Sequence, residues 1–201
     1  MKPLRLGIAG CIGSGKSVVS KILRTLGIPV YDCDSEAKRV MHTNACIRQE
    51  LIENFGKECY PDGKELDRKY LAGIIFNNPV ALKTINGIVH PRVKEDFEEW
   101  SLRQHCPIVA MESAIIFESG FRNTVDRIIA VYAPKETCIK RAALRSGSSY
   151  DEIEKRLKNQ MPPEAIVQKS DFVIYNDCND ALLPQITALF KNLGTIRDDS
   201  K

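Results

Sequence analysis

Eight consecutive residues near the N-terminus have the types and spacing of a phosphate-binding loop. The run Gly10–Ser17 reads G-C-I-G-S-G-K-S and directly follows the apolar stretch Leu6–Ala9, an expected strand, so it matches the pattern G-x-x-x-x-G-K-[ST] in its usual context. In such a loop Lys16 places a positive charge on the β- and γ-phosphates, and Ser17 offers a hydroxyl ligand to Mg²⁺. The pattern predicts that the chain uses a nucleoside triphosphate.

The glycines of this run explain how a backbone can hold an anion. Gly10, Gly13 and Gly15 let the chain turn without Cβ clashes, so that successive N–H groups point inward, and the helix that follows adds the positive end of its dipole. A glycine-rich turn that only closes a structural βα unit is the alternative. We assign ATP binding to Cys11, Ile12, Gly13, Ser14, Gly15, Lys16, Ser17 and Val18, and Mg²⁺ binding to Ser17.

Two aspartates follow the second expected strand, Val30-Tyr31. Asp32 and Asp34 would lie at the carboxyl end of that strand, where α/β sheets place ligands. Asp34 could accept the proton of an acceptor hydroxyl or orient it for in-line attack. Capping of the helix that begins near Ser35 is the alternative for either aspartate, and spacing alone does not separate the two roles.

Three arginines lie on an expected helix pair, Lys135 to Arg145 and Tyr150 to Gln160. Arg141 and Arg145 are four residues apart and share one helix face, while Arg156 belongs to the second helix. Such a hairpin is typical of a lid whose arginines stabilise the charge of a transferring γ-phosphoryl group. A solvated basic face is the alternative.

Glu112 ends the apolar strand Ile108–Met111, in the position of a Walker B acid. It could hold Mg²⁺ through water, cap a helix, or contact the acceptor.

Apolar runs alternate with helical patterns, which indicates an α/β fold with a parallel sheet flanked by helices. We expect one P-loop domain over 1–201 with a five-stranded sheet, whose remaining strands are Ile128–Tyr132 and Phe172–Tyr175. The expected core covers about 1–36, 104–134 and 165–201, with a helical insertion at about 37–103 and a lid at about 135–164. Further expectations are a capping box of Ser149 and Glu152, an interruption of the helical insertion at His90-Pro91, and a last helix from Leu182 that is followed by a polar tail.

Composition limits the function classes. The 201 residues are 43% hydrophobic and 27% charged, and the net charge of +3 is spread along the chain, which does not favour a nucleic-acid partner. No apolar run approaches the length of a membrane span, and the seven cysteines contain no C-x-x-C pair. We expect a cytoplasmic monomer without a membrane partner.

The type of phosphate-loop protein follows from what is missing. The sequence has neither the D-x-x-G nor the N-K-x-D motif of a regulatory GTPase, and large motor ATPases usually need a longer chain. A compact kinase that moves the γ-phosphoryl group to a small acceptor fits these facts. A kinase for a nucleoside or nucleotide, and a non-catalytic nucleotide-binding module, stay open as alternatives.

Taken together, the motifs resemble those of the dephospho-CoA kinases, which phosphorylate the ribose 3′-hydroxyl of dephospho-CoA in the last step of coenzyme A synthesis. The resemblance spans about residues 6–176. Its motifs are the loop Gly10–Ser17, the turn Asp32-Cys33-Asp34, the segment Asn86–Val93, the strand and loop through Phe117-Glu118, Gln160-Met161, and Ser170–Asn176.

The resemblance implies a role for each matching residue. Asp34 would be the catalytic carboxylate and Arg141 the transition-state arginine, with Lys16 on the phosphates and Arg145 in the same lid. Dephospho-CoA would bind among the inserted helices near His90 and Pro91, with Asp34 and Glu112 also contacting it. Asn176 would lie near the adenine ring, although a turn residue is an equally natural role for it.

Some positions depart from the family pattern, which usually reads L-T-G-G-I-G-S-G-K-S-T at the loop. Ala9 and Val18 replace threonines, which puts nucleotide affinity in question, and Ser113-Ala114 replaces isoleucine-proline. Cys11 lies near a helix N-terminus and Lys16, two influences that lower a thiol pKa, so we hypothesise a reactive thiol that bound ATP protects. An inert buried cysteine is the alternative.

Overall fold

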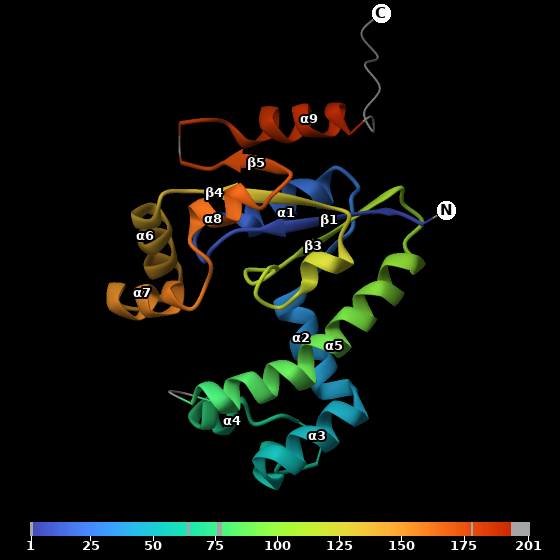
Figure 1. Cartoon of the computed structure of the whole chain (residues 1–201), viewed down its shortest axis with the longest axis vertical. Helices are drawn as coiled ribbons and strands as arrows, with labels where there is room; N and C mark the ends of the chain where they lie inside the picture. The colour runs from blue at the N-terminus through green and yellow to red at the C-terminus, as the bar shows by residue number, and fades with distance from the viewer. Residues whose placement is uncertain (1, 64, 76–77, 178, 194–201) are drawn as a thin grey trace, which may run out of the picture. The chain divides into compact units, whose positions relative to one another are not determined.

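The computed structural model describes residues 2–63, 65–75, 78–177 and 179–193. The chain divides into two compact units, one made of Met1–Tyr31 with Gln104–Lys201 and the other of Asp32–Arg103. Figure 1 labels most of the helices and strands of both units. The expected polar tail after residue 193 and Cys178 lie outside the described residues.

The first unit is built on a parallel β-sheet, as the sequence predicted. The strands are β1 (Leu4–Ala9), β2 (Val30–Asp32), β3 (Ile108–Glu112), β4 (Arg127–Tyr132) and β5 (Phe172–Tyr175), in the order β2-β3-β1-β4-β5. β1 pairs in parallel with β3 and with β4, and β4 pairs in parallel with β5. The central position of β1 places the loop that follows it in the middle of one sheet edge.

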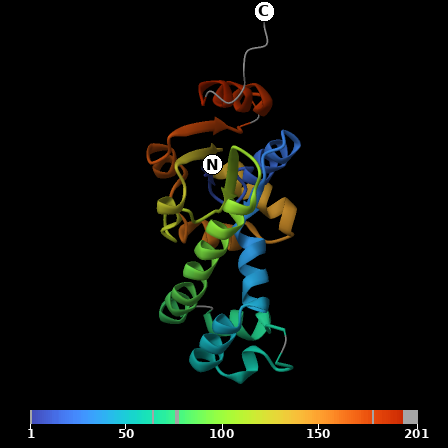
Figure 2. The ribbon, with the colours of Figure 1, turned by 90° about the vertical axis from the view of Figure 1, so that its right-hand side faces the viewer.

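Helices bury the apolar side chains of the sheet. Leu6 and Ile8 of β1 have no exposed surface and pack in one cluster with Leu23 of α1 (Lys16–Thr25) and Phe190 of α9 (Leu182–Asn192). Figure 2 shows α9 lying beside β5. Because helices cover the sheet, its strands read as continuous apolar runs, and those runs are the signal that predicted them.

The remaining helices complete this unit around the strand ends. They are η2 (Phe121–Thr124), α6 (Lys135–Ser146), α7 (Tyr150–Lys158) and α8 (Pro163–Gln168). The predicted capping box is confirmed: Ser149 Oγ accepts a hydrogen bond from Glu152 N, and the Glu152 carboxylate accepts one from Ser149 N. α7 ends at Lys158 instead of continuing to Gln160, which frees Gln160 from the helix.

The second unit is helical, with α2 (Cys33–Thr43), α3 (Ala45–Phe55), η1 (Lys57–Cys59), α4 (Arg68–Ile75) and α5 (Pro79–Arg103). The predicted interruption at His90-Pro91 is wrong, because α5 continues through Pro91. A proline inside a helix removes one hydrogen bond and crowds the carbonyl four residues before it, here that of Gly87. Val89, Val93 and Phe97 on either side of it are buried, and this packing keeps both halves helical. The ribbon of α5 bends along its length (Figure 1).

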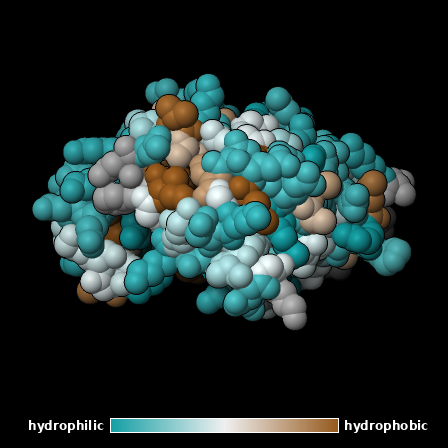
Figure 3. Space-filling model, turned by 90° about the horizontal axis from the view of Figure 1, so that it is seen from below, coloured by the Kyte–Doolittle hydropathy of each residue, from teal (hydrophilic) through white to brown (hydrophobic). Residues whose placement is uncertain are grey.

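Figure 3 shows hydrophilic side chains over most of one face, with small hydrophobic patches between them. In the part of the chain that the structure describes, we find no helix with the length and apolar character that a membrane crossing requires.

A leucine pair tests the importance of the core. Leu23 has no exposed surface, whereas Leu144 on α6 is 78% exposed. Leu23→Ala removes packing and leaves a cavity, so we expect it to lower the free energy of unfolding by about 2–5 kcal/mol, and Leu144→Ala by less than about 1 kcal/mol. Chemical denaturation of both variants measures the difference, and equal losses would contradict the assignment of Leu23 to the core.

Candidate active site

The loop between β1 and α1 has a conformation that requires glycine. Gly13 and Gly15 have φ angles of 82° and 102°. A Cβ on Gly13 would overlap the backbone carbonyl of Cys138 on α6, and a Cβ on Gly10 would lie 2.6 Å from both Ser14 Oγ and Val131 O. The loop therefore packs with its bare backbone against the neighbouring elements, and this packing holds its curvature.

Positive charge is concentrated where α1 begins. Lys16 is the first residue of α1, is only 8% exposed, and donates a hydrogen bond from Nζ to Cys11 O at 3.2 Å. The first turn of α1 holds no acidic residue, so nothing in it offsets the positive end of the helix dipole. Lysine, dipole and loop amides together form an anion site.

Ser14 supplies a direct sign that the loop fits an oxygen-rich group. Its side chain has no exposed surface, and its Oγ has no hydrogen-bond partner among the described residues. A buried hydroxyl without a partner costs free energy, which a bound phosphate oxygen can recover. Ser17, one residue into α1 after Lys16, is exposed, so its hydroxyl is accessible to a metal ion.

Two hydrogen bonds connect the loop to segments far away in the sequence, and a third joins one of these segments to α6. Asn176, directly after β5, donates from Nδ2 to Ser14 O at 2.8 Å. Its own backbone oxygen accepts a hydrogen bond from Arg141 Nη1 at 2.7 Å. Gln160 accepts a hydrogen bond from Ile12 N at 3.0 Å through its Oε1. The structure thus brings Arg141 and Asn176 to the loop, and Arg145 lies exposed near the end of α6.

Gln160 is the residue whose role the sequence did not reveal. It appeared there only as part of a family motif, and a single glutamine after a helix carries no distinctive pattern. The segment around it is held by Glu118, which accepts a hydrogen bond from Met161 N at 2.7 Å. Only the fold brings this segment against the loop.

A pair of thiols also lies at the loop. Cys11 Sγ is 3.2 Å from Cys138 Sγ on α6, and both side chains are buried. The hydrogen bond with Cys138 and the charge of Lys16 hold the pKa of Cys11 below its usual value, although burial opposes this shift.

Glu112 lies at the same sheet edge as the loop. It is paired with Ile8 in the parallel register, and the next residue, Ser113, donates from its backbone N to Ile8 O at 3.2 Å. The side chain of Glu112 is half-buried. This position suits either a metal-bound water or an acceptor group.

The other sequence-predicted residues belong to the unit Asp32–Arg103. Asp32 caps α2, because its carboxylate accepts hydrogen bonds from Asp34 N at 3.0 Å and Ser35 N at 3.3 Å. Asp34, in the first turn of α2, has an exposed side chain. His90 and Pro91 lie within α5, and burial lowers the pKa of His90, which favours the neutral imidazole at neutral pH.

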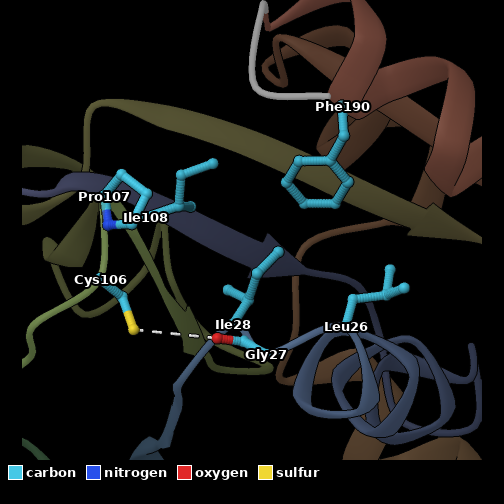
Figure 4. Close-up of a pocket in the computed structure, with 7 residues that line it drawn as sticks. All are labelled: Leu26, Gly27, Ile28, Cys106, Pro107, Ile108 and Phe190. Carbon is cyan, nitrogen blue, oxygen red and sulfur yellow. Dashed lines mark hydrogen bonds between the residues drawn. The ribbon is translucent and has the colours of Figure 1, made fainter. Parts of the chain in front are cut away.

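A second concavity lies at the opposite edge of the sheet, near the start of β3. Its volume is about 360 Å³, and it is lined by Leu26, Gly27, Ile28, Cys106, Pro107, Ile108 and Phe190 (Figure 4). The lining side chains carry no charge. It therefore lacks the groups that bind phosphate.

The strand order and the loop geometry define the class of protein, a P-loop nucleotide-binding protein. A family model described as dephospho-CoA kinase matches residues 4–181, so the chain belongs to the dephospho-CoA kinase family. A dephospho-CoA kinase from Bacteroides fragilis is 45% identical over 187 residues, which cover 92% of this chain and 91% of that protein.

Two solved structures are similar over nearly the whole chain. TT1252 from Thermus thermophilus has a TM-score of 0.83 at 34% sequence identity, covering 98% of this chain and 100% of that chain. A dephospho-CoA kinase from Campylobacter jejuni has a TM-score of 0.70 at 27% identity, covering 96% of this chain and 98% of that chain.

The tight packing of the loop can be tested with two glycines. Gly13→Ala adds a Cβ that overlaps the Cys138 carbonyl, whereas Gly27→Ala has a similar positive φ, 79°, but adds its Cβ in open space. We expect Gly27→Ala to cost about 1 kcal/mol of unfolding free energy for its backbone strain alone. Gly13→Ala should cost at least about 1 kcal/mol more and should weaken MgATP binding at least ~10-fold. Denaturation and nucleotide titration measure both effects, and equal behaviour of the two variants would contradict the contact.

Proposed function

We propose that this protein transfers the γ-phosphoryl group of ATP to the ribose 3′-hydroxyl of dephospho-CoA, which yields coenzyme A. The observation that carries the proposal is the dephospho-CoA kinase match over residues 4–181, which includes the whole phosphate loop. The fold supports it, because the loop follows the central strand of the parallel sheet, where such sheets bind ligands.

The loop holds the triphosphate. The backbone N–H groups of residues 13 and 15–17 and the Lys16 ammonium neutralise the phosphates, and the Ser14 hydroxyl, which has no partner among the described residues, fits an oxygen-rich ligand. Ser17 would hold Mg²⁺, and the ion when bound supplies further neutralisation of phosphate charge. Asn176, which is tied to Ser14 O, lies close enough to the loop to contact the nucleotide.

Arg141 and Arg145 act on the charge that spreads over the γ-phosphate during transfer. Arg141 donates one hydrogen bond to Asn176 O, which orients its guanidinium beside the loop. A guanidinium has five N–H donors, so this bond is compatible with further bonds to phosphate oxygens. Arg145 lies one turn further along α6 and would contact the phosphates when the lid formed by residues 135–164 closes.

Asp34 acts on the acceptor. Because Asp32 is occupied as the cap of α2, its carboxylate already has partners, and the exposed Asp34 is the carboxylate that can accept the hydroxyl proton. The helical insertion would bind the acceptor near His90 and Pro91, and Glu112 would contact it from the end of β3. We further propose that the protein acts as a cytoplasmic monomer, a setting in which its six described cysteines, all free thiols, would stay reduced.

Measured ADP release from MgATP tests the acceptor. The assay compares dephospho-CoA with no acceptor, with pantothenate and with a panel of nucleosides and nucleoside monophosphates, and mass spectrometry identifies the product. We expect strong stimulation by dephospho-CoA alone and one added phosphate. Activity only on a nucleoside would show that the protein is a kinase for a different acceptor. Binding of ATP without turnover on any acceptor would favour a regulatory module.

The role of Asp34 predicts a selective defect. Asp34→Asn removes the proton acceptor but no phosphate contact, so we expect kcat to fall about 10²–10⁴-fold while the affinity for ATP is retained. Asp62→Asn, at an exposed position of the same unit, is the matched control and should keep its rate. Steady-state kinetics and ATP titration check both, and substantial turnover of Asp34→Asn would remove Asp34 from the chemical step.

The proposed role of Arg141 predicts that a positive charge at this position is not sufficient for catalysis. Arg141→Lys keeps a cation but loses the planar set of donors that reaches Asn176 O and the phosphates together, so we expect kcat to fall at least ~10²-fold. Arg103→Lys, at the exposed end of α5, is the control. Comparable kcat values for the two variants would show that Arg141 contributes only to packing.

A further inference from the structure

Cys11 and Cys138 are 127 positions apart in the sequence, yet their Sγ atoms lie 3.2 Å apart. One belongs to the phosphate loop and the other to α6, the helix that carries Arg141. Both side chains are buried, at 1% and 0% exposure, in one apolar cluster with Ala133, Ile153 and Leu157. The pair therefore connects the phosphate loop directly to α6.

The surrounding contacts hold the two sulfur atoms facing each other. Gly13 packs on the backbone of Cys138 so closely that a Cβ would not fit, and Gln160 holds Ile12 N next to Cys11. These contacts are made by the two residues that follow Cys11 and restrain its backbone relative to α6. A disulfide has an S–S distance of about 2.05 Å, so bond formation requires an approach of only about 1 Å.

The two thiols differ in chemical character. The Lys16 ammonium lies near Cys11, and the hydrogen bond with Cys138 stabilises the Cys11 thiolate, so its pKa is lowered. The pKa of Cys138 is raised by the same hydrogen bond and by burial, and Ala133 O, 3.4 Å from its sulfur, is the other acceptor that its single S–H can reach. Cys11 is thus the nucleophile of the pair and Cys138 the second, resolving thiol.

We propose that Cys11 and Cys138 form an oxidative modification site, at which a hydroperoxide such as H₂O₂ converts the two thiols into a disulfide that joins the phosphate loop to α6. The Cys11 thiolate attacks one peroxide oxygen, the O–O bond breaks, and water leaves after protonation, which gives a sulfenic acid. The Cys138 sulfur then attacks the Cys11 sulfur, the S–OH bond breaks, and a second water leaves. The two thiols lose two electrons and two protons, and the peroxide takes up both.

The disulfide would change the loop that binds phosphate. It pulls Cys11 toward α6 and so displaces the loop backbone that follows, including the Gly13 amide of the anion site, while it also prevents α6 from moving independently of the loop. We therefore expect loss of turnover that a dithiol reductant reverses. This consequence rests on the proposed kinase function, whereas formation of the bond does not.

The test treats the full chain with H₂O₂ without nucleotide, blocks the remaining thiols with N-ethylmaleimide, and digests with trypsin. Cleavage at lysine and arginine places Cys11 in residues 6–16 and Cys138 in residues 136–140. We expect mass spectrometry to find these two peptides joined, and a sample treated with dithiothreitol to yield them separately. Turnover should fall at least ~10-fold with oxidation and recover on reduction.

Two variants complete the design. Cys46→Ser removes an exposed thiol and should behave as the unchanged protein, with the same cross-linked peptides. Cys138→Ser keeps a donor for Ala133 O and should form no cross-link, and Cys138→Ala replaces it if the serine variant does not fold.

Each outcome of this experiment either supports or overturns a stated part of the proposal. Absence of the joined peptides in the unchanged protein overturns the proposal, whichever acceptor the kinase uses. If the peptides are joined but turnover is unchanged, the claim that the disulfide disturbs the phosphate loop is wrong. If dephospho-CoA fails as acceptor, MgATP titration of the oxidised and reduced protein replaces turnover, and the disulfide result stands by itself.

Discussion

The backbone of Gly13 lies directly on the backbone of Cys138, and much of the site depends on this contact. A phosphate loop needs amides that point inward at fixed angles, but a run of glycines has high conformational entropy when nothing restrains it. Here α6 presses against the loop from one side and Asn176 holds Ser14 O from another. The restraint comes before any nucleotide binds, so part of the ordering cost is met during folding.

The helix that makes this contact, α6, is connected to two parts of the site. Its buried side contacts the loop through Cys138 and belongs to an apolar cluster shared with α7, while Arg141 reaches Asn176 O after β5. A displacement of α6 would therefore disturb both the loop and the segment that follows β5. In the lid that we propose, this arrangement would couple closure to the geometry of the phosphates, and it is the reason why a bond between two buried sulfur atoms would act on catalysis.

Several elements were predictable from the sequence because their signals are local. The five strands are apolar runs that are buried by helices, and all five predictions are confirmed. The capping box of Ser149 and Glu152 is likewise confirmed, since it depends on a spacing of three residues. The break expected at His90-Pro91 was wrong, because the burial of Val89 and Val93 outweighs the local cost of a proline within α5.

The sequence by itself determined the class of site, because the glycines, lysine and serine of residues 10–17 are contiguous and each type has one chemical use. Only the tertiary structure decided which distant side chains support that site. Gln160, Asn176 and Cys138 reach the loop through hydrogen bonds and packing between segments that are more than a hundred residues apart, and no local pattern encodes such a contact. Which aspartate caps α2 was also left open by the spacing, and the structure shows that it is Asp32, whose carboxylate accepts the backbone N–H groups of Asp34 and Ser35.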